Sequence, residues 1–309
     1  MADLIVFDSP AATGTSYNLS GLSAQPEAAG PTALERTDAT AAATVTDGPA
    51  HIAGGERLPI SGWCDGIQST LKLGYTDCLP LVAAYTAAGA ADGRTPTSLV
   101  GLVEHIGLYT ALGHPGADDI ADTTGLPVEY VDFPDLSALP TIIADRIGSV
   151  RAAAEHTLIT RLTETKPGHN WVVDGSLAHT GADTGLIGVV KTHGVRYLDD
   201  ETDLYRLPAG WRSSVFTFTH PRRTEEDTAP TVFSAYVRLH HRPDSAWDAG
   251  LIRVETIDPD LLDAACATVT AAAQPATAHT TDRRWDRHLD PIARCEDLLR
   301  SRRPIIFGR

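Results

Sequence analysis

The fold of this chain is decided by the stretch Asn170-Trp171-Val172-Val173-Asp174-Gly175-Ser176-Leu177. Its Trp- and Val-rich beginning predicts a buried strand. Gly175 lets the backbone turn away sharply, which leaves the Asp174 carboxylate at the C-terminal end of that strand. Open α/β sheets place their chemistry at this end. An Asp-Gly pair alone is more often a plain turn, so the neighbouring segments have to decide between a turn and a site.

The same Asp-Gly pairing occurs earlier, after another apolar run. The segment Leu58-Pro59-Ile60-Ser61-Gly62-Trp63-Cys64-Asp65-Gly66 predicts a strand that ends at Asp65. Residues Ile67–Leu73 follow after almost no connection, so we expect them to pair back as an antiparallel hairpin. The next apolar run, Leu79–Ala88, is compatible with a strand and with a helix, because its alanines favour helices.

A helix is expected over Thr141–Leu162, directly before the deciding stretch, because apolar residues recur there at helical spacing. In a helical projection the apolar arc also contains Arg151 and Glu155. Two interpretations are open. The two residues are four apart and can pair with each other. Alternatively Glu155 belongs to a site, because a charge within an apolar arc needs a partner or a role.

The rest of the chain is expected to alternate short strands and helices. Residues 90–140 carry frequent Pro, Gly and Asp and are predicted to be irregular, apart from one apolar stretch of undecided type and one strand. Asp-Pro pairs are expected to open helices at Asp258 and Asp290. The undecided stretch is Ser98–Leu112, and further strands are expected at Val128–Phe133, Leu186–His193, Val215–Thr219, Phe233–Leu239 and Leu251–Ile257, the last two as a hairpin.

This order predicts an α/β fold of the RNase H-like type: a mixed sheet flanked by helices, with an additional β-hairpin and a C-terminal helix. A right-handed crossover brings the first strand and the strand after the helix together in parallel, so Asp65 and Asp174 are expected side by side. Two carboxylates that close repel each other unless a cation lies between them. Together with Glu155 they would form an oxygen-rich cluster suited to Mg²⁺ or Mn²⁺. Two such ions can activate water in phosphodiester hydrolysis.

Composition sets limits on these expectations. The chain has 309 residues, of which 42% are hydrophobic and 21% charged, as in ordinary globular proteins. Its net charge of −15 repels nucleic acid on average, so a nucleic-acid-binding protein of this composition needs local basic patches or a basic partner. The candidate patches are Arg222-Arg223, Arg283-Arg284-Arg287 and Arg300-Arg302-Arg303.

Domain organisation and location are also predicted from composition. Residues 1–55, rich in Ala, Thr, Gly and Ser, are expected to form an N-terminal arm with a single strand-like run at Leu4–Phe7, and residues 56–309 a single domain. The four cysteines lack C-x-x-C spacing, which favours free thiols. The sequence has no apolar run long enough to span a bilayer and no N-terminal signal, so no membrane association and a cytoplasmic location are expected.

Three motifs of this sequence resemble those of the NurA nucleases: Asp65-Gly66, Val172-Val173-Asp174-Gly175-Ser176-Leu177 and Gly188-Val189-Val190-Lys191-Thr192. Tyr236–Leu239 and Ile252–Glu255 are also similar to a hairpin of that family. The resemblance covers roughly residues 57–300. It implies an RNase H-like, manganese-dependent DNA nuclease that works with the hexameric HerA ATPase in end resection or phage defence. It further implies a homodimeric ring around a central DNA channel.

By this resemblance Asp65 and Asp174 would bind metal, Glu155 would be the acid supplied by the helix, and Lys191 would help to hold the scissile phosphate. The family usually has Asp-Gly-Ser where this chain has Asp65-Gly66-Ile67, and often an Ala-His pair where this chain has Arg294-Cys295-Glu296. The fourth ligand is therefore open, with Glu296 ahead of Asp282 and His288.

Two other functions stay in competition with the nuclease. One is a catalytically inactive RNase H-like scaffold subunit that binds DNA or an ATPase partner, which would differ by lacking affinity for metal ions. The other is a cysteine hydrolase that uses Cys64 beside a histidine, although a cysteine in an apolar strand is more often structural.

Overall fold

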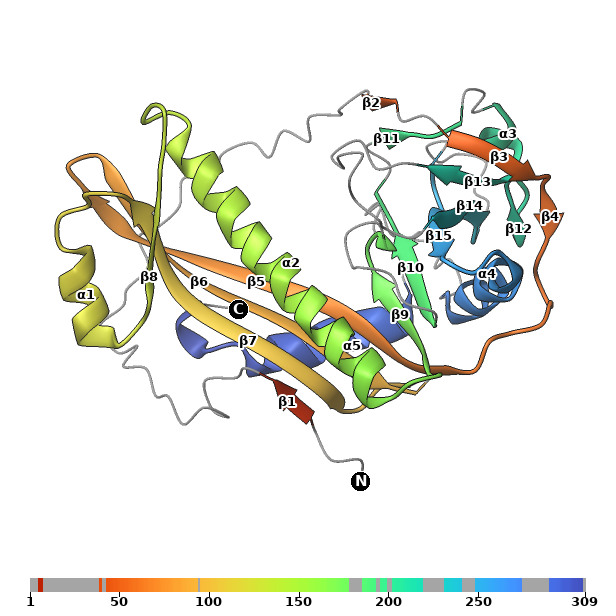
Figure 1. Ribbon diagram of the computed structural model, residues 1–309, viewed down its shortest axis with the longest axis horizontal. Coiled ribbons are helices and arrows are strands. Elements are labelled where there is room, and N and C mark those ends of the chain that lie inside the picture. The colour runs from red at the N-terminus through yellow and green to blue at the C-terminus, as the bar shows by residue number, and fades with distance from the viewer. Residues whose placement is uncertain are drawn as a thin grey trace.

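The computed structural model describes residues 5–7, 39–40, 43–93, 95–177, 185–192, 195–198, 202–218, 231–240, 248–273 and 289–307. The molecule is an elongated α/β structure (Figure 1). Within the described residues, its main element is a sheet of 13 strands whose central order is β1-β7-β6-β5-β9-β10-β15-β14-β12-β4.

The middle of the sheet has the predicted topology. Strands β5 (Ile60–Thr76), β6 (Leu79–Asp92) and β7 (Leu99–Ala111) form an antiparallel meander. β9 (Asn170–Asp174) lies parallel to β5 on its other side, and β10 (Leu186–Val190) lies parallel to β9. In the expected RNase H-like order, a helical crossover follows an antiparallel meander and leads to a strand parallel to the first strand of that meander. The structure has this order, so the predicted fold class is confirmed.

The second half of the sheet is antiparallel and contains the predicted hairpin. β14 (Val232–Arg238) and β15 (Leu251–Thr256) pair with each other, and β15 continues the sheet from β10. The remaining strands are short: β1 (Ile5–Phe7), β2 (Ala39–Thr40), β3 (Ala43–Asp47), β4 (Ala50–His51), β8 (Val128–Val131), β11 (Val195–Arg196), β12 (Trp211–Arg212) and β13 (Val215–Phe218).

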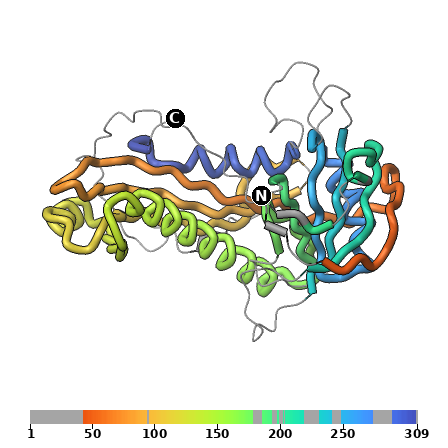
Figure 2. Tube along the Cα trace, turned by 90° about the horizontal axis from the view of Figure 1, so that it is seen from above, coloured from red at the N-terminus to blue at the C-terminus, as the bar shows by residue number. Residues whose placement is uncertain are grey.

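Two long helices cover opposite faces of the meander (Figure 2). The crossover helix α2 (Leu139–Thr165) packs on β5, β6 and β7, and the C-terminal helix α5 (Asp290–Arg302) packs on β5 and β6 from the other side. None of the described helices is long and apolar enough to span a bilayer. The other helical segments are α1 (Ala117–Thr124), α3 (Thr202–Arg206), η2 (Pro259–Leu261), α4 (Leu262–Ala272) and η4 (Ile305–Phe307).

The predicted strand end at Asp65 is wrong. Asp65 and Gly66 lie inside β5, opposite Gly89 and Ala88 of β6, so the strand continues through them. The chain reverses later, at Asp77 and Cys78, whose φ angles of 50° and 67° give the left-handed turn that a tight hairpin needs. This turn lacks a glycine, which explains why the sequence pattern placed the hairpin at the wrong point.

The alanine-rich run after that turn is the strand β6 and not a helix. Ala83, Ala84, Ala87 and Ala88 are completely buried because α2 and α5 cover both faces of this central strand. Small side chains let both helices approach closely, so tertiary packing overrides the helical preference of alanine. Residues 90–140 are also less irregular than predicted, since they contain β7 and α1 in addition to the expected strand β8.

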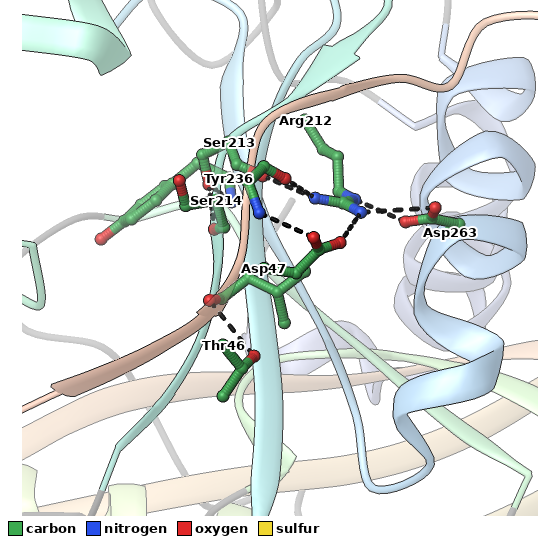
Figure 3. A network of polar contacts seen from close by, with 9 residues as sticks. Thr46, Asp47, Arg212, Ser213, Ser214, Tyr236 and Asp263 are labelled. Atoms are coloured by element: carbon green, nitrogen blue, oxygen red, sulfur yellow. Dashed lines mark hydrogen bonds and ion pairs between the residues drawn. The ribbon is translucent and has the colours of Figure 1, made fainter.

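Residues 1–55 were expected to contain a single strand, but β3 and β4 of this segment also join the sheet. A buried arginine anchors these two strands. Arg212 of β12 is 3% exposed; its guanidinium donates to Asp47 Oδ2 at 2.8 Å and to Asp263 Oδ1 of α4 at 2.5 Å. The same guanidinium donates to the carbonyl of Gly48. Figure 3 shows Arg212 lying between Asp47 and Asp263. Residues 43–51 are therefore tied to both the sheet and α4.

Candidate carboxylate site

Asp65 and Asp174 lie next to each other on neighbouring parallel strands. The register pairs Cys64 with Val173, and each acid is the following residue of its strand. Side chains alternate between the two faces of a sheet. Trp63 and Val172, two residues before the acids, share a core with Ile292 of α5. Both carboxylates therefore belong to the face of the sheet that α5 covers.

The environment of Asp65 is unfavourable for a negative charge. Burial raises the pKa of Asp65 well above its usual value, and the negative charge of Asp174 raises this pKa further. Lys191 and a hydrogen bond of 2.7 Å from the backbone N–H of Gly66 oppose the rise without cancelling it. Within the described part of the chain, no basic side chain forms a salt bridge with Asp65. A bound cation would relieve this repulsion.

Lys191 is brought to Asp174 by the strand next to β9. It follows β10 directly, and its Nζ donates to Asp174 Oδ2 at 2.8 Å. The two side chains are 27% and 26% exposed, so this salt bridge borders solvent. Lys191 thus pairs with Asp174, and its ammonium group lies at the edge of the pair of acids.

Glu155 reaches the site from α2, on the other face of the sheet, through a gap left by a glycine. A Cβ atom at Gly66 would overlap the Glu155 carboxylate, so Glu155 lies directly against the backbone that follows Asp65. Burial raises the pKa of Glu155, Arg151 opposes the rise, and the charge of Asp174 adds to it. Arg151 Nη1 donates to Glu155 Oε1 at 2.5 Å. The predicted ion pair is therefore present, and Glu155 is also electrostatically coupled to Asp174.

Glu296 approaches Asp65 from α5. Its negative charge contributes to the raised pKa of Asp65, and its own carboxylate accepts a hydrogen bond of 2.6 Å from Arg300. The other two candidates for a fourth ligand, Asp282 and His288, lie outside the described residues. The structure thus brings Glu296 into the neighbourhood of the two strand acids.

The donor groups fit a hard divalent cation by type, but most of them are engaged by basic side chains. Carboxylate oxygens are the ligands that Mg²⁺ and Mn²⁺ prefer. Glu155, Asp174 and Glu296 each form a salt bridge with a basic residue. Among the described residues, no group of three or more His, Cys, Asp or Glu side chains is arranged so that it could hold a metal ion. A third carboxylate would have to leave its basic partner to join Asp65 and Asp174.

Sequence reasoning did not assign a role to Glu255 of β15. Its carboxylate is completely buried and accepts hydrogen bonds from Ser176 Oγ at 2.9 Å and from the backbone N–H of Leu177 at 2.8 Å. Arg253 Nε donates to the same carboxylate at 2.8 Å. Glu255 therefore fixes the segment that follows Asp174. The available signal was the presence of Arg253 and Glu255 on one face of an otherwise apolar strand.

Cys64 has the environment of a structural cysteine. It is 2% exposed, and burial raises the pKa of its thiol, with the negative charges of Asp65 and Glu155 adding to the rise. A thiol in such surroundings stays protonated and is a poor nucleophile. These contacts argue against the cysteine-hydrolase alternative.

Comparisons with known proteins add little to this picture. No protein-family model matches the sequence. No curated protein matches it either. Among solved structures, the chain is similar to the catalytic domain of human Endonuclease V, with 15% identity and a TM-score of 0.36 over 81% of this chain and 89% of that one.

Proposed function

We propose that this protein is a metal-dependent nuclease that hydrolyses phosphodiester bonds. The observation that carries the proposal is the pair formed by Asp65 and Asp174. These acids are adjacent on parallel strands, and burial, together with the negative charge of Asp174, raises the pKa of Asp65. Burying like charges together is unfavourable and is typical of sites that receive a cation. Mg²⁺ or Mn²⁺, when bound there, would supply an activated water and stabilise the leaving oxygen.

The other side chains have roles that follow from their positions. Asp65 and Asp174 would hold the cation, with Glu155 as a third carboxylate once it separates from Arg151. Lys191 lies at the solvent border beside Asp174, where its ammonium group can contact a phosphate oxygen of the substrate. Glu296, whose charge acts on Asp65, would add a fourth carboxylate from α5.

A cleavage assay on the purified chain tests this proposal. Labelled DNA and RNA are incubated with increasing Mn²⁺ or Mg²⁺, with wild-type protein, Asp174→Asn, and Asp297→Asn as the matched control. Asp297 is an exposed acid of α5. We expect cleavage by wild type and by the control, and a loss of at least about 100-fold in Asp174→Asn. Full activity of folded Asp174→Asn would refute the assignment.

A specific observation also favours a second function, the catalytically inactive scaffold. Glu155, Asp174 and Glu296 are held by Arg151, Lys191 and Arg300, and such pairs can replace a cation as the neutralising partner. Calorimetric titration with Mn²⁺ in the absence of DNA separates the two functions. Binding that Asp65→Asn abolishes supports the nuclease, whereas absence of binding in well-folded wild type supports the scaffold.

The more specific assignment rests on the resemblance to the NurA nucleases. It proposes DNA as substrate, Mn²⁺ as the ion, a HerA-type hexameric ATPase as partner, and a homodimer. Light scattering of the chain, alone and mixed with a HerA-type hexameric ATPase, tests the last two. Tyr236 and Glu255 are buried within the chain, which argues against the β14–β15 hairpin as a dimer contact.

A further inference from the structure

A groove opens beside the carboxylate site, along the part of β5 that does not pair with β9. β9 pairs with β5 only as far as Cys64. Beyond this point, in the described part of the chain, β5 pairs with β6 alone and its other edge is free. A pocket of about 540 Å³ lies at this edge and is lined by Gly66, Ile67, Gln68, Ser69, Arg151, Glu296, Arg300 and Arg303. Glu296 lines the pocket and also acts electrostatically on Asp65, so the groove adjoins the site.

Three arginines and one acid, Glu296, line the groove, and Glu296 pairs with Arg300. Arg151 comes from α2, and Arg300 and Arg303 come from the C-terminal end of α5 and the residue after it. Arg303 is held in place, because its Nη1 donates to Ser69 Oγ of the β5 edge at 2.9 Å. Arg300 and Arg151 are 55% and 36% exposed. Their remaining N–H groups can therefore donate to an incoming anion, and guanidinium groups match phosphate oxygens in geometry.

The lining also indicates what part of a nucleic acid would be contacted. Among the residues that the structure describes, none that lines this groove is aromatic. Proteins that hold single strands through their bases use aromatic rings as stacking surfaces. Contacts made only by arginines and polar groups read the phosphate backbone and carry no sequence information. The volume suits a short piece of one strand, since pockets of about 300–1,000 Å³ hold ligands of small-molecule size.

We propose that the free edge of β5 and the arginines Arg151, Arg300 and Arg303 form a sequence-independent site for the phosphates of a single nucleic-acid strand that leads to Asp65. This inference rests on the proposed nuclease function for its biological meaning. The binding itself requires only the groove, so the two can fail separately.

Binding without cleavage is the test. Fluorescence anisotropy measures the affinity of the full chain, in EDTA, for short oligothymidine, short oligoadenine and a duplex of the two. We expect equal affinity for the two single strands and weaker binding of the duplex. The double variant Arg300→Ala/Arg303→Ala should lose at least about tenfold in affinity. Its plot of log affinity against log salt should flatten by about 0.7 for each phosphate contact removed.

Two further variants keep the test decisive. Arg294→Ala removes an arginine of the same helix that also pairs with an acid four residues away but does not line the groove, so its affinity should equal that of wild type. Arg300→Lys/Arg303→Lys keeps the charge and should retain most of the affinity. Wild-type affinity in the double alanine variant, or no binding by wild type, overturns the inference. Binding in the absence of any metal-dependent cleavage would leave the groove intact and refute the nuclease.

Discussion

The buried carboxylate of Glu255 accepts a hydrogen bond of 2.8 Å from the backbone N–H of Leu177, three residues beyond Asp174. The contact joins β15 to the segment that leaves the candidate site. Gly188 makes room for it, because a Cβ there would press on both Leu177 and Glu255. The guanidinium of Arg253 completes the arrangement, with its Cζ 4.5 Å from the ring centre of Tyr197. A buried ion pair from a distant part of the chain thus holds Ser176 and Leu177, shortly after Asp174.

Glu255→Gln should destabilise the protein by about 3–5 kcal/mol, because it leaves the buried Arg253 without its counter-charge. Chemical denaturation of both proteins measures the difference. Ser176→Ala is the matched control, since it removes one hydrogen bond to the same carboxylate but leaves the ion pair. It should cost only about 0.5–1.5 kcal/mol. Equal stability of Glu255→Gln and wild type would show that the ion pair does not support the fold.

Asp65 should make the metal-free protein less stable as the pH rises. Its pKa is raised in the folded state, so the folded protein holds this proton more tightly than the unfolded chain does. The stability that the Asp65 carboxyl contributes is therefore fully present at pH values below the ordinary aspartate pKa of 3.8. It is lost as the pH rises through the raised pKa of the folded state. Asp65→Asn should raise the melting temperature in EDTA at neutral pH, by about 2–4 °C for each kcal/mol of repulsion removed.

The same variant tests the cation at this position. Adding Mn²⁺ should raise the melting temperature of wild type, because a ligand that binds only the folded state stabilises it. Asp65→Asn should show a much smaller rise. If Asp65→Asn melts below wild type in EDTA at neutral pH, the charge of Asp65 does not destabilise the folded protein. If Mn²⁺ raises the melting temperatures of Asp65→Asn and wild type equally, the ion binds elsewhere.

Arg212→Met should destabilise the protein by about 2–4 kcal/mol, because it removes several hydrogen bonds that involve charged groups from a buried position. Methionine keeps much of the apolar stem, so the change isolates the guanidinium contacts to Asp47, Asp263 and Gly48. Arg146→Met, at a salt bridge whose arginine is 51% exposed, is the control and should change stability by less than about 1 kcal/mol. Similar values for both variants would mean that the Arg212 network contributes little.

The sequence predicted the elements whose patterns are local. The crossover helix and β9 were recognised because helical spacing and a Val-rich run are local patterns. The sequence pattern did not predict β6 as a strand or the full length of β5, since both depend on tertiary contacts. The alanines of β6 are strand residues only because two helices cover them, and Asp65-Gly66 stays extended because β6 pairs with it on both sides of Asp65.

The candidate site was predictable to a similar degree. Adjacent strands with a right-handed crossover were sufficient to bring Asp65 and Asp174 together. The salt bridges of Glu155, Asp174 and Glu296 follow from side-chain conformations that no sequence pattern fixes. The role of Glu255 requires knowing that β15 lies against β10 and the Ser176–Leu177 segment, which is a contact between residues nearly 80 positions apart.

Gly66→Ala offers a way to displace Glu155 without removing its charge. The added Cβ would occupy the space of the Glu155 carboxylate, which is the end of a flexible side chain and can swing away toward Arg151. Thermal stability should therefore change by less than about 1 kcal/mol, whereas Mn²⁺-dependent cleavage should fall by at least about tenfold if Glu155 belongs to the site. Glu155→Gln should have the same two effects, because Arg151 is 36% exposed and its pairing contributes little to stability.

Melting curves in EDTA and cleavage rates are measured on the same preparations, with Gly148→Ala as control, since a Cβ at this glycine of α2 meets nothing. Unchanged cleavage in both Gly66→Ala and Glu155→Gln would reduce Glu155 to the partner of Arg151 and leave Asp65 and Asp174 to bind a cation without an acid from α2.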